Sequence, residues 1–172
     1  MASLSQQSSV IPLPTAPPVI DPKAPLDIAR EFVRRLYHCD AVQILHNQND
    51  TFYAWTGTHY SEIEESALRV KVYKFLDGAF RLLEEGTARV KPATKLINNV
   101  IDALKAEVHL GLIHLPPTWL YASKFAPKEI IPCQNGLLHL PSGHLLPHTP
   151  QFFADNVLQF DFNAQADRPC NG

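Results

Sequence analysis

The sequence predicts an α+β domain with a mainly helical core of about three principal helices and two small antiparallel β units. Three segments place apolar residues at spacings of three and four, as helices with one buried face do. Two other regions alternate runs of strand-forming residues with Asn, Gly and Pro, as hairpins and meanders do. Because a helix followed by a hairpin can present a wing, a winged-helix-like arrangement is one packing that this order allows.

The first 25 residues are dominated by Pro, Ser, Gln and Ala, which do not maintain regular hydrogen-bonded structure. We therefore expect a disordered or polyproline-like, Pro/Ser-rich linker over residues 1–25. The helical pattern begins near Pro25 and is expected to end at residues 38–40. Its apolar face consists of Ile28, Phe32, Val33 and Leu36.

A small meander is expected over residues 42–63. Short strands at 42–45, 51–55 and 59–63 are separated by turn-forming residues. The aromatic residues of this meander are Phe52, Tyr53, Trp55 and Tyr60. Such rings stack on bases in single-strand binders, but in so small a sheet we take core packing as the default.

Two more helices are expected, over residues 64–85 and 92–110. In the first, apolar positions from Leu68 to Leu83 follow the 3.6-residue period, and Gly86 is a suitable C-terminal cap. In the second, a proline occupies the first turn, where its missing N–H costs nothing. The expected buried stripe of this helix consists of Leu96, Val100, Leu104 and Val108.

The last third of the chain predicts a hairpin and a further strand. Gln134-Asn135-Gly136 is expected to form a turn or bulge before an apolar run at 137–140. Pro141-Ser142-Gly143 then turns the chain into a second run at 144–146. Residues 157–162 alternate in the manner of a final strand.

Composition limits the functions that the chain can have. Its 172 residues, 45% of them hydrophobic, suffice for one core, and its net charge of −2 gives no general attraction to polyanions. Cys39, Cys133 and Cys170 lack the paired spacing of a disulfide framework, which fits a reduced cytosolic setting. No apolar run approaches the roughly 20 residues of a membrane span, and no signal-peptide pattern is present. We therefore expect a soluble, cytoplasmic protein without membrane contact.

The sequence contains no catalytic motif. It has neither a Gly-rich phosphate loop nor a Gly-x-Ser-x-Gly elbow, and the segment 160–163 supplies one carboxylate where a two-metal site needs several. His139, His144 and His148 lie near Cys133 in the sequence, which raises a metal-site hypothesis. Because neither a Cys-x-x-Cys knuckle nor a helical His pair is present, we favour structural or solvent-facing roles for them. We expect no catalytic residue, no metal and no cofactor in this chain.

Charge is segregated along the sequence. Residues 69–105 contain eight basic residues against four acidic ones, whereas residues 40–66 contain five acidic residues and no Lys or Arg. On the expected helix, Lys71, Lys74 and Arg81 share one face. The candidate nucleic-acid-binding residues are Arg69, Lys71, Lys74, Arg81, Arg89, Lys91 and Lys95. The alternative is a solvated helix face, or one that meets an acidic neighbour of the same assembly.

The stretch from Asn135 to Pro150 resembles a signature of the collar domain that precedes the superfamily 3 helicase in phage, plasmid and poxvirus-type primase-helicases. Segments at 52–60, 68–76, 91–94 and 117–120 are similar to other elements of that family, in the same order. The resemblance therefore covers about residues 26–165. Its signature residues here are Phe52, Tyr53, Gly57, Tyr60, Asn135, Gly136, Leu137, Gly143, His148 and Pro150.

The resemblance implies a non-catalytic accessory domain at residues 26–165 that assists oligomeric assembly and DNA engagement by the helicase. Residues 166–172 are then expected to lead toward an ATPase domain that this chain lacks, and ATP and Mg are expected only there. The parent is expected to be a DNA primase and ATP-dependent DNA helicase.

The implied partners are single-stranded or forked DNA, the helicase ATPase domain and other copies of the chain. The implied setting is the bacterial host cytosol of a phage, prophage or plasmid protein. The alternatives are a purely structural oligomerisation scaffold without DNA affinity, and a primase fragment with its own nucleotide chemistry.

Overall fold

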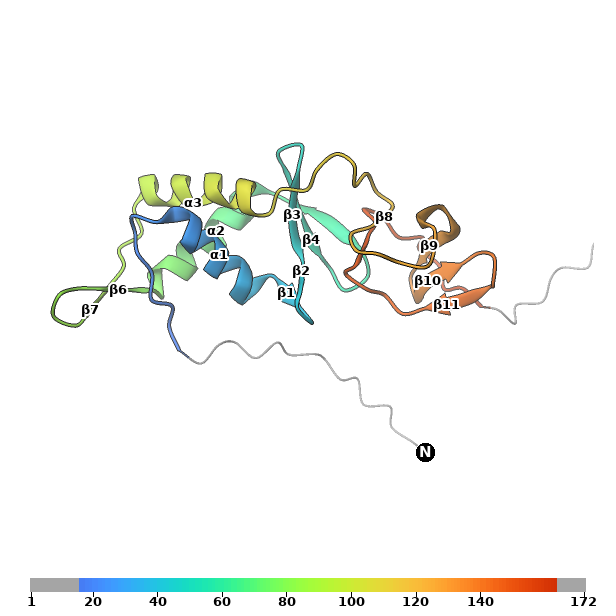
Figure 1. The fold of residues 1–172 in the computed structure, drawn as a ribbon, viewed down its shortest axis with the longest axis horizontal. Helices are drawn as coiled ribbons and strands as arrows, with labels where there is room; N and C mark the ends of the chain where they lie inside the picture. Colours follow the sequence, from blue (N-terminus) through green and yellow to red (C-terminus); the bar gives the residue numbers. More distant parts are fainter. Residues whose placement is uncertain (1–15, 164–172) are drawn as a thin grey trace, which may run out of the picture.

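Helices fill one end of the molecule, from which one hairpin projects, and the other small antiparallel sheets fill the middle and the other end (Figure 1). The computed structural model describes residues 16–163. The helices are α1 (Pro25–Leu36), α2 (Glu65–Asp77), α3 (Thr94–Glu107) and the short 3₁₀ helix η1 (Pro127–Glu129). The strands are β1 (His38–Cys39), β2 (Val42–Gln43), β3 (Leu45–Gln48), β4 (Thr51–Trp55), β5 (Tyr60–Ile63), β6 (Phe80–Leu82), β7 (Thr87–Arg89), β8 (Thr118–Trp119), β9 (Ile130–Cys133), β10 (Gly136–His139), β11 (His144–Leu146) and β12 (Phe152–Phe153). The predicted α+β class is confirmed.

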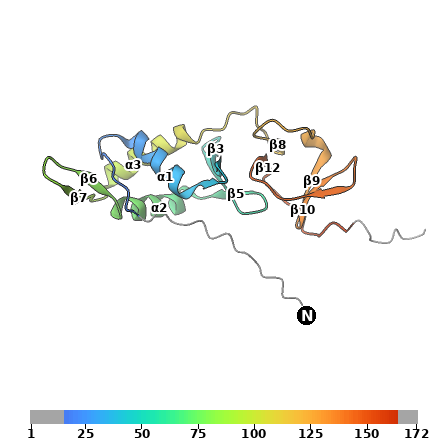
Figure 2. The ribbon, with the colours of Figure 1, turned by 60° about the horizontal axis from the view of Figure 1, so that its bottom comes forward.

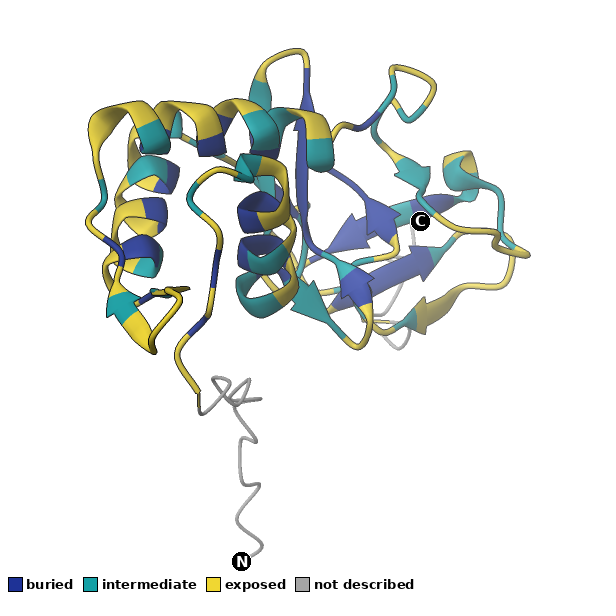
Figure 3. Cartoon of the chain, turned by 60° about the vertical axis from the view of Figure 1, so that its left-hand side comes forward, coloured by how far each residue is buried: buried dark blue, intermediate teal, exposed yellow. Residues whose placement is uncertain are grey.

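Each of the three α-helices buries one apolar face against a common core (Figure 3). α1 packs on α3, and α2 covers the same core from another side. Fully buried side chains such as Phe32, Leu68, Leu76 and Leu104 come from all three helices. Because each buried side chain of this size contributes about 1.5–3 kcal/mol, their shared core fixes the helices relative to one another.

The predicted meander is present as a three-stranded sheet in the order β3, β4, β5. Its first strand is Leu45–Gln48 rather than residues 42–45, because Val42–Gln43 pairs with β1 in a separate hairpin. Its first turn is formed by Asn49 and Asp50, which both have positive φ, a conformation that these residue types tolerate. Phe52 and Tyr60 are buried, while Tyr53 and Trp55 are half-buried and pack on a core cluster. Core packing of the aromatic residues, rather than an open stacking surface, is therefore confirmed.

The predicted helix over 64–85 is wrong beyond Asp77, because residues 80–89 form the hairpin of β6 and β7. Gly86, expected as a helix cap, instead has a φ of 89° in the hairpin turn. The side chain of Leu82, which extended the apolar pattern, is 73% exposed. The hairpin projects from the helical end, away from the sheet at the other end (Figures 1 and 2).

The chain before α1 contributes to the hairpin and to the core. The backbone N–H of Ile20 donates to the carbonyl of Phe80, and the N–H of Phe80 donates to the carbonyl of Pro18, both at 2.8 Å. The Ile20 side chain is buried in the helical core. Residues 18–20 are thus an ordered part of the domain, because β6 supplies hydrogen-bond partners that the sequence pattern could not show. Residues 1–15 of the predicted linker and the predicted tail at 166–172 lie outside the described residues.

The helix predicted over 92–110 is shorter, spanning Thr94–Glu107. Its buried face is formed by Ile97, Val100, Ile101 and Leu104, and Leu96 is only partly buried. The helix starts after the proline rather than at it, because Ala93 has an extended conformation and occupies the N-cap position.

The predicted signature hairpin is present as β10 and β11, with Leu137 opposite Leu146 and His139 opposite His144. A third strand, β9, pairs with β10 across the turn at 134–135. A side chain at Gly136 would place its Cβ only 2.5 Å from the Leu146 carbonyl oxygen, so the close strand approach requires glycine.

The final strand expected at 157–162 is not formed. Within that stretch only Leu158 makes a β-bridge, to Cys133, and the residues around it are irregular. Asn135 explains part of this path, because its side-chain amide exchanges two 2.9 Å hydrogen bonds with the backbone of Phe162. The stretch is thus held by two backbone hydrogen bonds, from Leu158 to Pro132 and from Gln134 to Phe160, and by the Asn135 side chain, without a regular strand.

A small aromatic cluster joins the helical end to the last third of the chain. Tyr60, Leu110 and Phe153 are its buried members, and the Tyr60 and Phe153 rings lie 5.0 Å apart. The backbone N–H of Tyr60 also donates to the carbonyl of Ala154 at 2.8 Å. Within residues 16–163, no helix has both the length and the apolar character needed to cross a bilayer.

Candidate nucleic-acid interface

The seven predicted basic residues do not form one helical face. Arg81 lies on β6, not on α2 with Lys71 and Lys74, because α2 ends at Asp77. The expectation that these three residues share a face of one helix is therefore wrong. The structure instead distributes six of them among three settings, and the seventh, Lys95, lies in the first turn of α3.

The first setting is an internal contact between α2 and α3. Arg69 donates to the Glu65 carboxylate at 2.8 Å and to the Asn98 side-chain oxygen at 2.6 Å. Lys105 lies 3.2 Å from the same Glu65 carboxylate and 3.5 Å from that of Asp50. The hydrogen bond from Arg69, followed by that from Lys105, lowers the pKa of Glu65 below its usual value. Arg69 is thus compensated within the domain.

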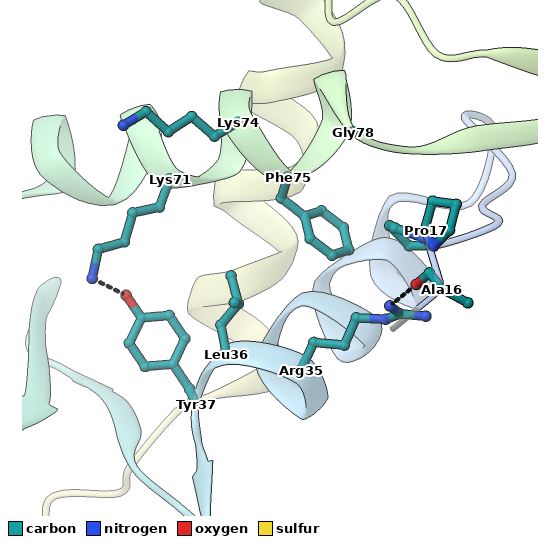
Figure 4. A pocket seen from close by; sticks show the side chains of 10 residues that line it. Ala16, Pro17, Arg35, Leu36, Tyr37, Lys71, Lys74, Phe75 and Gly78 are labelled. Carbon is teal, nitrogen blue, oxygen red and sulfur yellow. Dashed lines mark hydrogen bonds between the residues drawn. The ribbon is translucent and has the colours of Figure 1, made fainter. Parts of the chain in front are cut away.

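The second setting is a groove between α1, α2 and residues 16–18, with a volume of about 490 Å³ (Figure 4). Lys71 and Lys74 of α2 line it together with Arg35 of α1. The Lys71 ammonium group donates to the Tyr37 hydroxyl at 2.9 Å. Because this partner is neutral, the contact positions Lys71 without cancelling its charge.

The third setting is the base of the β6–β7 hairpin. Arg81, Arg89 and Lys91 line a cavity of about 450 Å³ there, together with Leu96 of α3. The Arg89 guanidinium donates to the backbone carbonyl of Asp77, at the C-terminal end of α2, at 3.1 Å. This end of a helix carries partial negative charge and attracts cations, so Arg89 connects the hairpin to α2.

Four of the predicted residues are exposed, and their side chains make no hydrogen bond or ion pair with another residue in the described part of the chain. They are Lys74, Arg81, Lys91 and Lys95. They lie near the end of α2, on β6, between β7 and α3, and at the start of α3, which are segments that meet at the helical end of the molecule (Figure 1).

Acidic side chains gather at the opposite end of α2. Asp50, Glu62, Glu64 and Glu65 surround a shallow hollow at the start of that helix and the edge of the β3–β5 sheet. The acidic hollow and the exposed cations thus lie at opposite ends of α2, although Asp50 and Glu65 of the hollow are paired with Lys105, and Glu65 also with Arg69.

The signature residues occupy turns, strand pairs and the contact between the two halves of the chain. Gly57 and Gly143 have φ values of 106° and 66° in tight turns. The Tyr60 hydroxyl donates to the Pro150 carbonyl, and a ring nitrogen of His148 lies 3.2 Å from the Gln134 carbonyl oxygen. Phe52 and Leu137 are buried, whereas Tyr53 is half-buried against the junction cluster.

Two of the three histidines of the signature region, His139 and His148, have protein partners, and His144 is exposed. His139 lies 2.8 Å from the Ser142 hydroxyl and 3.6 Å from the Glu129 carboxylate, with its ring against Phe125. Between residues 16 and 163, no three His, Cys, Asp or Glu side chains are grouped closely enough to hold a metal ion.

Nothing in the sequence indicates that Arg35 and Tyr37 line a groove with Lys71 and Lys74. The helical pattern predicts Phe75 as a buried residue of the helix, whereas Phe75 also lines this groove. The groove exists because residues 16–18 lie beside α1 and α2, where the Ala16 carbonyl accepts a 2.8 Å hydrogen bond from Arg35. A segment predicted to be a linker gave no signal for this contact.

Comparison with known families identifies the class of protein to which this fold belongs. Residues 30–171 match N-terminal domains of primase-helicases of the phage and poxvirus type. The chain belongs to this family, which is described as D5 N terminal like. The predicted resemblance is confirmed, and the family context is DNA replication with a helicase-containing parent. A search of curated proteins gave no match.

Proposed function

We propose that this domain helps a helicase-containing replication protein to engage DNA, by binding phosphates at its helical end. The observation that carries the proposal is a set of exposed cations at the helical end whose side chains have no partner among residues 16–163: Lys74, Arg81, Lys91 and Lys95. A local cluster of this kind attracts a polyanion although the whole chain has a net charge of −2.

The geometry favours contact with the DNA backbone. The cations lie on α2, β6, the connector before α3 and α3 itself, and Arg81 and Lys91 line one cavity. Because Arg89 ties the hairpin to the end of α2, these cations are held on an ordered frame. Exposed Lys and Arg side chains contact phosphates without reading the sequence. The proposed contact therefore guides DNA toward the motor rather than selecting a site.

Fluorescence anisotropy with single-stranded and forked DNA across a salt series tests the proposal. Binding should weaken steeply with salt, because each phosphate contact releases condensed counterions. The double variant Lys91→Glu and Lys95→Glu should lose most of the affinity. The matched control is Lys128→Glu on η1, an exposed lysine near the other end of the molecule, which should bind like the wild type. No binding at low salt would overturn the proposal.

A second candidate is subunit assembly without DNA affinity. The acidic hollow around Asp50 and Glu64 and the basic helical end lie at opposite ends of α2, so one copy has complementary charges to offer another. Light scattering during gel filtration distinguishes this candidate. It predicts oligomers that dissociate in high salt, together with no DNA binding by the wild-type chain.

A further inference from the structure

The groove between α1, α2 and residues 16–18 combines an apolar lining with cations. Figure 4 shows Phe75 extending from α2 toward α1, with Leu36 reaching up from α1. Phe75 packs edge-on against the buried Phe32 ring at 5.3 Å, which fixes its orientation while leaving it half-buried. The groove therefore offers a partly open aromatic side chain on a rigid base.

Arg35 builds the wall of this groove. Its guanidinium donates to the Ala16 carbonyl and to the Glu31 carboxylate, so it holds residues 16–18 in place and its charge is offset. The two neighbours on α2, Lys71 and Lys74, have no such carboxylate partner. Among the described residues, none of the side chains that line the groove is acidic. The groove thus carries about two uncompensated positive charges beside an apolar lining.

We propose that this groove takes one unpaired base of a single-stranded DNA, with the adjoining phosphates on Lys71 and Lys74. This inference rests on the DNA binding proposed above, and it adds that the groove selects single-stranded over duplex DNA. Single-strand binding sites combine a cationic track with aromatic side chains that contact the bases. A volume of about 490 Å³ is in the ordinary range for a small-molecule-sized ligand group.

The spacing of the cations suits a nucleic-acid backbone. Lys71 and Lys74 are three residues apart, about 4.5 Å along the helix axis, and both side chains are long enough to reach neighbouring phosphates. Gly78 of the groove lining directly follows Asp77, whose carbonyl accepts the hydrogen bond from Arg89 at the base of the hairpin. A strand that leaves the groove past Gly78 would thus run toward that second basic site. Duplex DNA keeps its bases stacked inside, so it has no base to offer the groove.

The test compares two fluorescent 12-mers with equal numbers of phosphates, one of deoxythymidylate and one with abasic tetrahydrofuran sugars. The wild type should bind the deoxythymidylate 12-mer about tenfold more tightly, which is the effect of one base contact of this kind. Phe75→Leu should remove most of that preference while keeping the charge. The matched control is Tyr73→Leu, which changes an exposed aromatic residue on the same helix outside the groove and should keep it.

A second variant guards against loss of packing at Phe75. Gly78→Leu adds a side chain to the lining of the groove, and its Cβ meets only ordinary contacts at 3.6 and 3.7 Å. It should also abolish the preference. Circular dichroism and urea midpoints establish that each variant is folded.

The outcomes separate the two proposals. Equal, salt-sensitive binding of both 12-mers overturns base capture and leaves phosphate binding intact. Absence of binding to either 12-mer overturns both. If an acidic, leucine-containing peptide binds in a Phe75-dependent manner while the 12-mers show no difference, the groove serves a protein ligand and base capture is overturned.

Discussion

The hydroxyl group of Tyr60 donates a hydrogen bond to the carbonyl oxygen of Pro150 at 2.7 Å, across 90 residues of chain. Tyr60 is fully buried, and burial raises the pKa of its hydroxyl well above the usual value, so the proton remains available for this bond. Tyr60 belongs to the signature residues at 52–60, and Pro150 belongs to those at 135–150. Two sequence motifs that are far apart in the chain therefore belong to one structural contact.

Tyr60→Phe should lower the free energy of unfolding by about 1–3 kcal/mol, because it leaves the Pro150 carbonyl without this donor. Urea denaturation followed by circular dichroism measures the change. Tyr73→Phe removes a hydroxyl from an exposed tyrosine and should leave the midpoint unchanged. Equal midpoints for the wild type and Tyr60→Phe would show that the bond adds no net stability.

His46 makes the domain sensitive to acid. Burial lowers the pKa of His46 from 6.5 to about 4, and its Nε2 atom has no hydrogen-bond partner. Between pH 6.5 and about pH 4, His46 is protonated in the unfolded chain and neutral in the folded chain. Stability from this group is therefore complete above pH 6.5 and is lost as the pH falls toward 4, by up to about 3 kcal/mol.

The measurement is the free energy of unfolding at pH 7, 6, 5 and 4 for the wild type and His46→Gln. The variant lacks the titrating ring, so its stability should fall less over this range, whatever its value at pH 7. Parallel pH curves for the two proteins would contradict the assignment.

Gly136→Ala should destabilise the domain by about 1–3 kcal/mol, which is typical of overpacking. The added Cβ would lie 2.5 Å from the Leu146 carbonyl oxygen and 2.8 Å from the Leu145 side chain, at a φ of 155°. Gly78→Ala is the control, since it has negative φ and room for a methyl group. Thermal unfolding of both variants is sufficient, and a normal melting temperature for Gly136→Ala would be the contrary result.

The hairpin assignment of residues 80–89 predicts unequal effects of two leucine truncations. Leu76→Ala should cost about 2–5 kcal/mol, because Leu76 is fully buried in the helical core. Leu82→Ala should change stability by less than about 0.5 kcal/mol, because Leu82 is exposed on β6. A continuous helix would bury both residues, so similar losses in urea denaturation would argue against the hairpin.

Periodicity identified α1, α2 and the meander because their buried faces are local patterns. It failed at residues 80–83, where Phe80, Leu82 and Leu83 continue the helical spacing but belong to a hairpin. The deciding interactions are the bonds of Phe80 to residues 18–20, some 60 residues earlier, which no local pattern contains. The strand expected at 157–162 is absent although its residues alternate as a strand does. The backbone N–H and carbonyl of Phe162 are hydrogen-bonded to the Asn135 side chain instead of to a neighbouring strand.

For the candidate site, the sequence predicted an excess of basic residues but not their arrangement in space. The sequence showed an excess of Lys and Arg at 69–105, but the partners of these residues depend on packing. Arg69 is compensated by Glu65, one helical turn away, whereas Arg81 became part of another element when α2 ended early. The aromatic groove could not be foreseen, since it needs the segment at 16–18 to lie against α1.

The two hydrogen bonds between Phe80 and residues 18–20 also have a mechanical meaning. Tension applied to the chain ahead of α1 acts first on the bond between the Ala16 carbonyl and Arg35, and next on these two bonds, which attach the chain to a hairpin whose other strand leads into α3. The load is therefore shared between α1 and the β6–β7 hairpin. The basic surface around Arg81 and Lys91 is built on one of the two elements that receive such a pull.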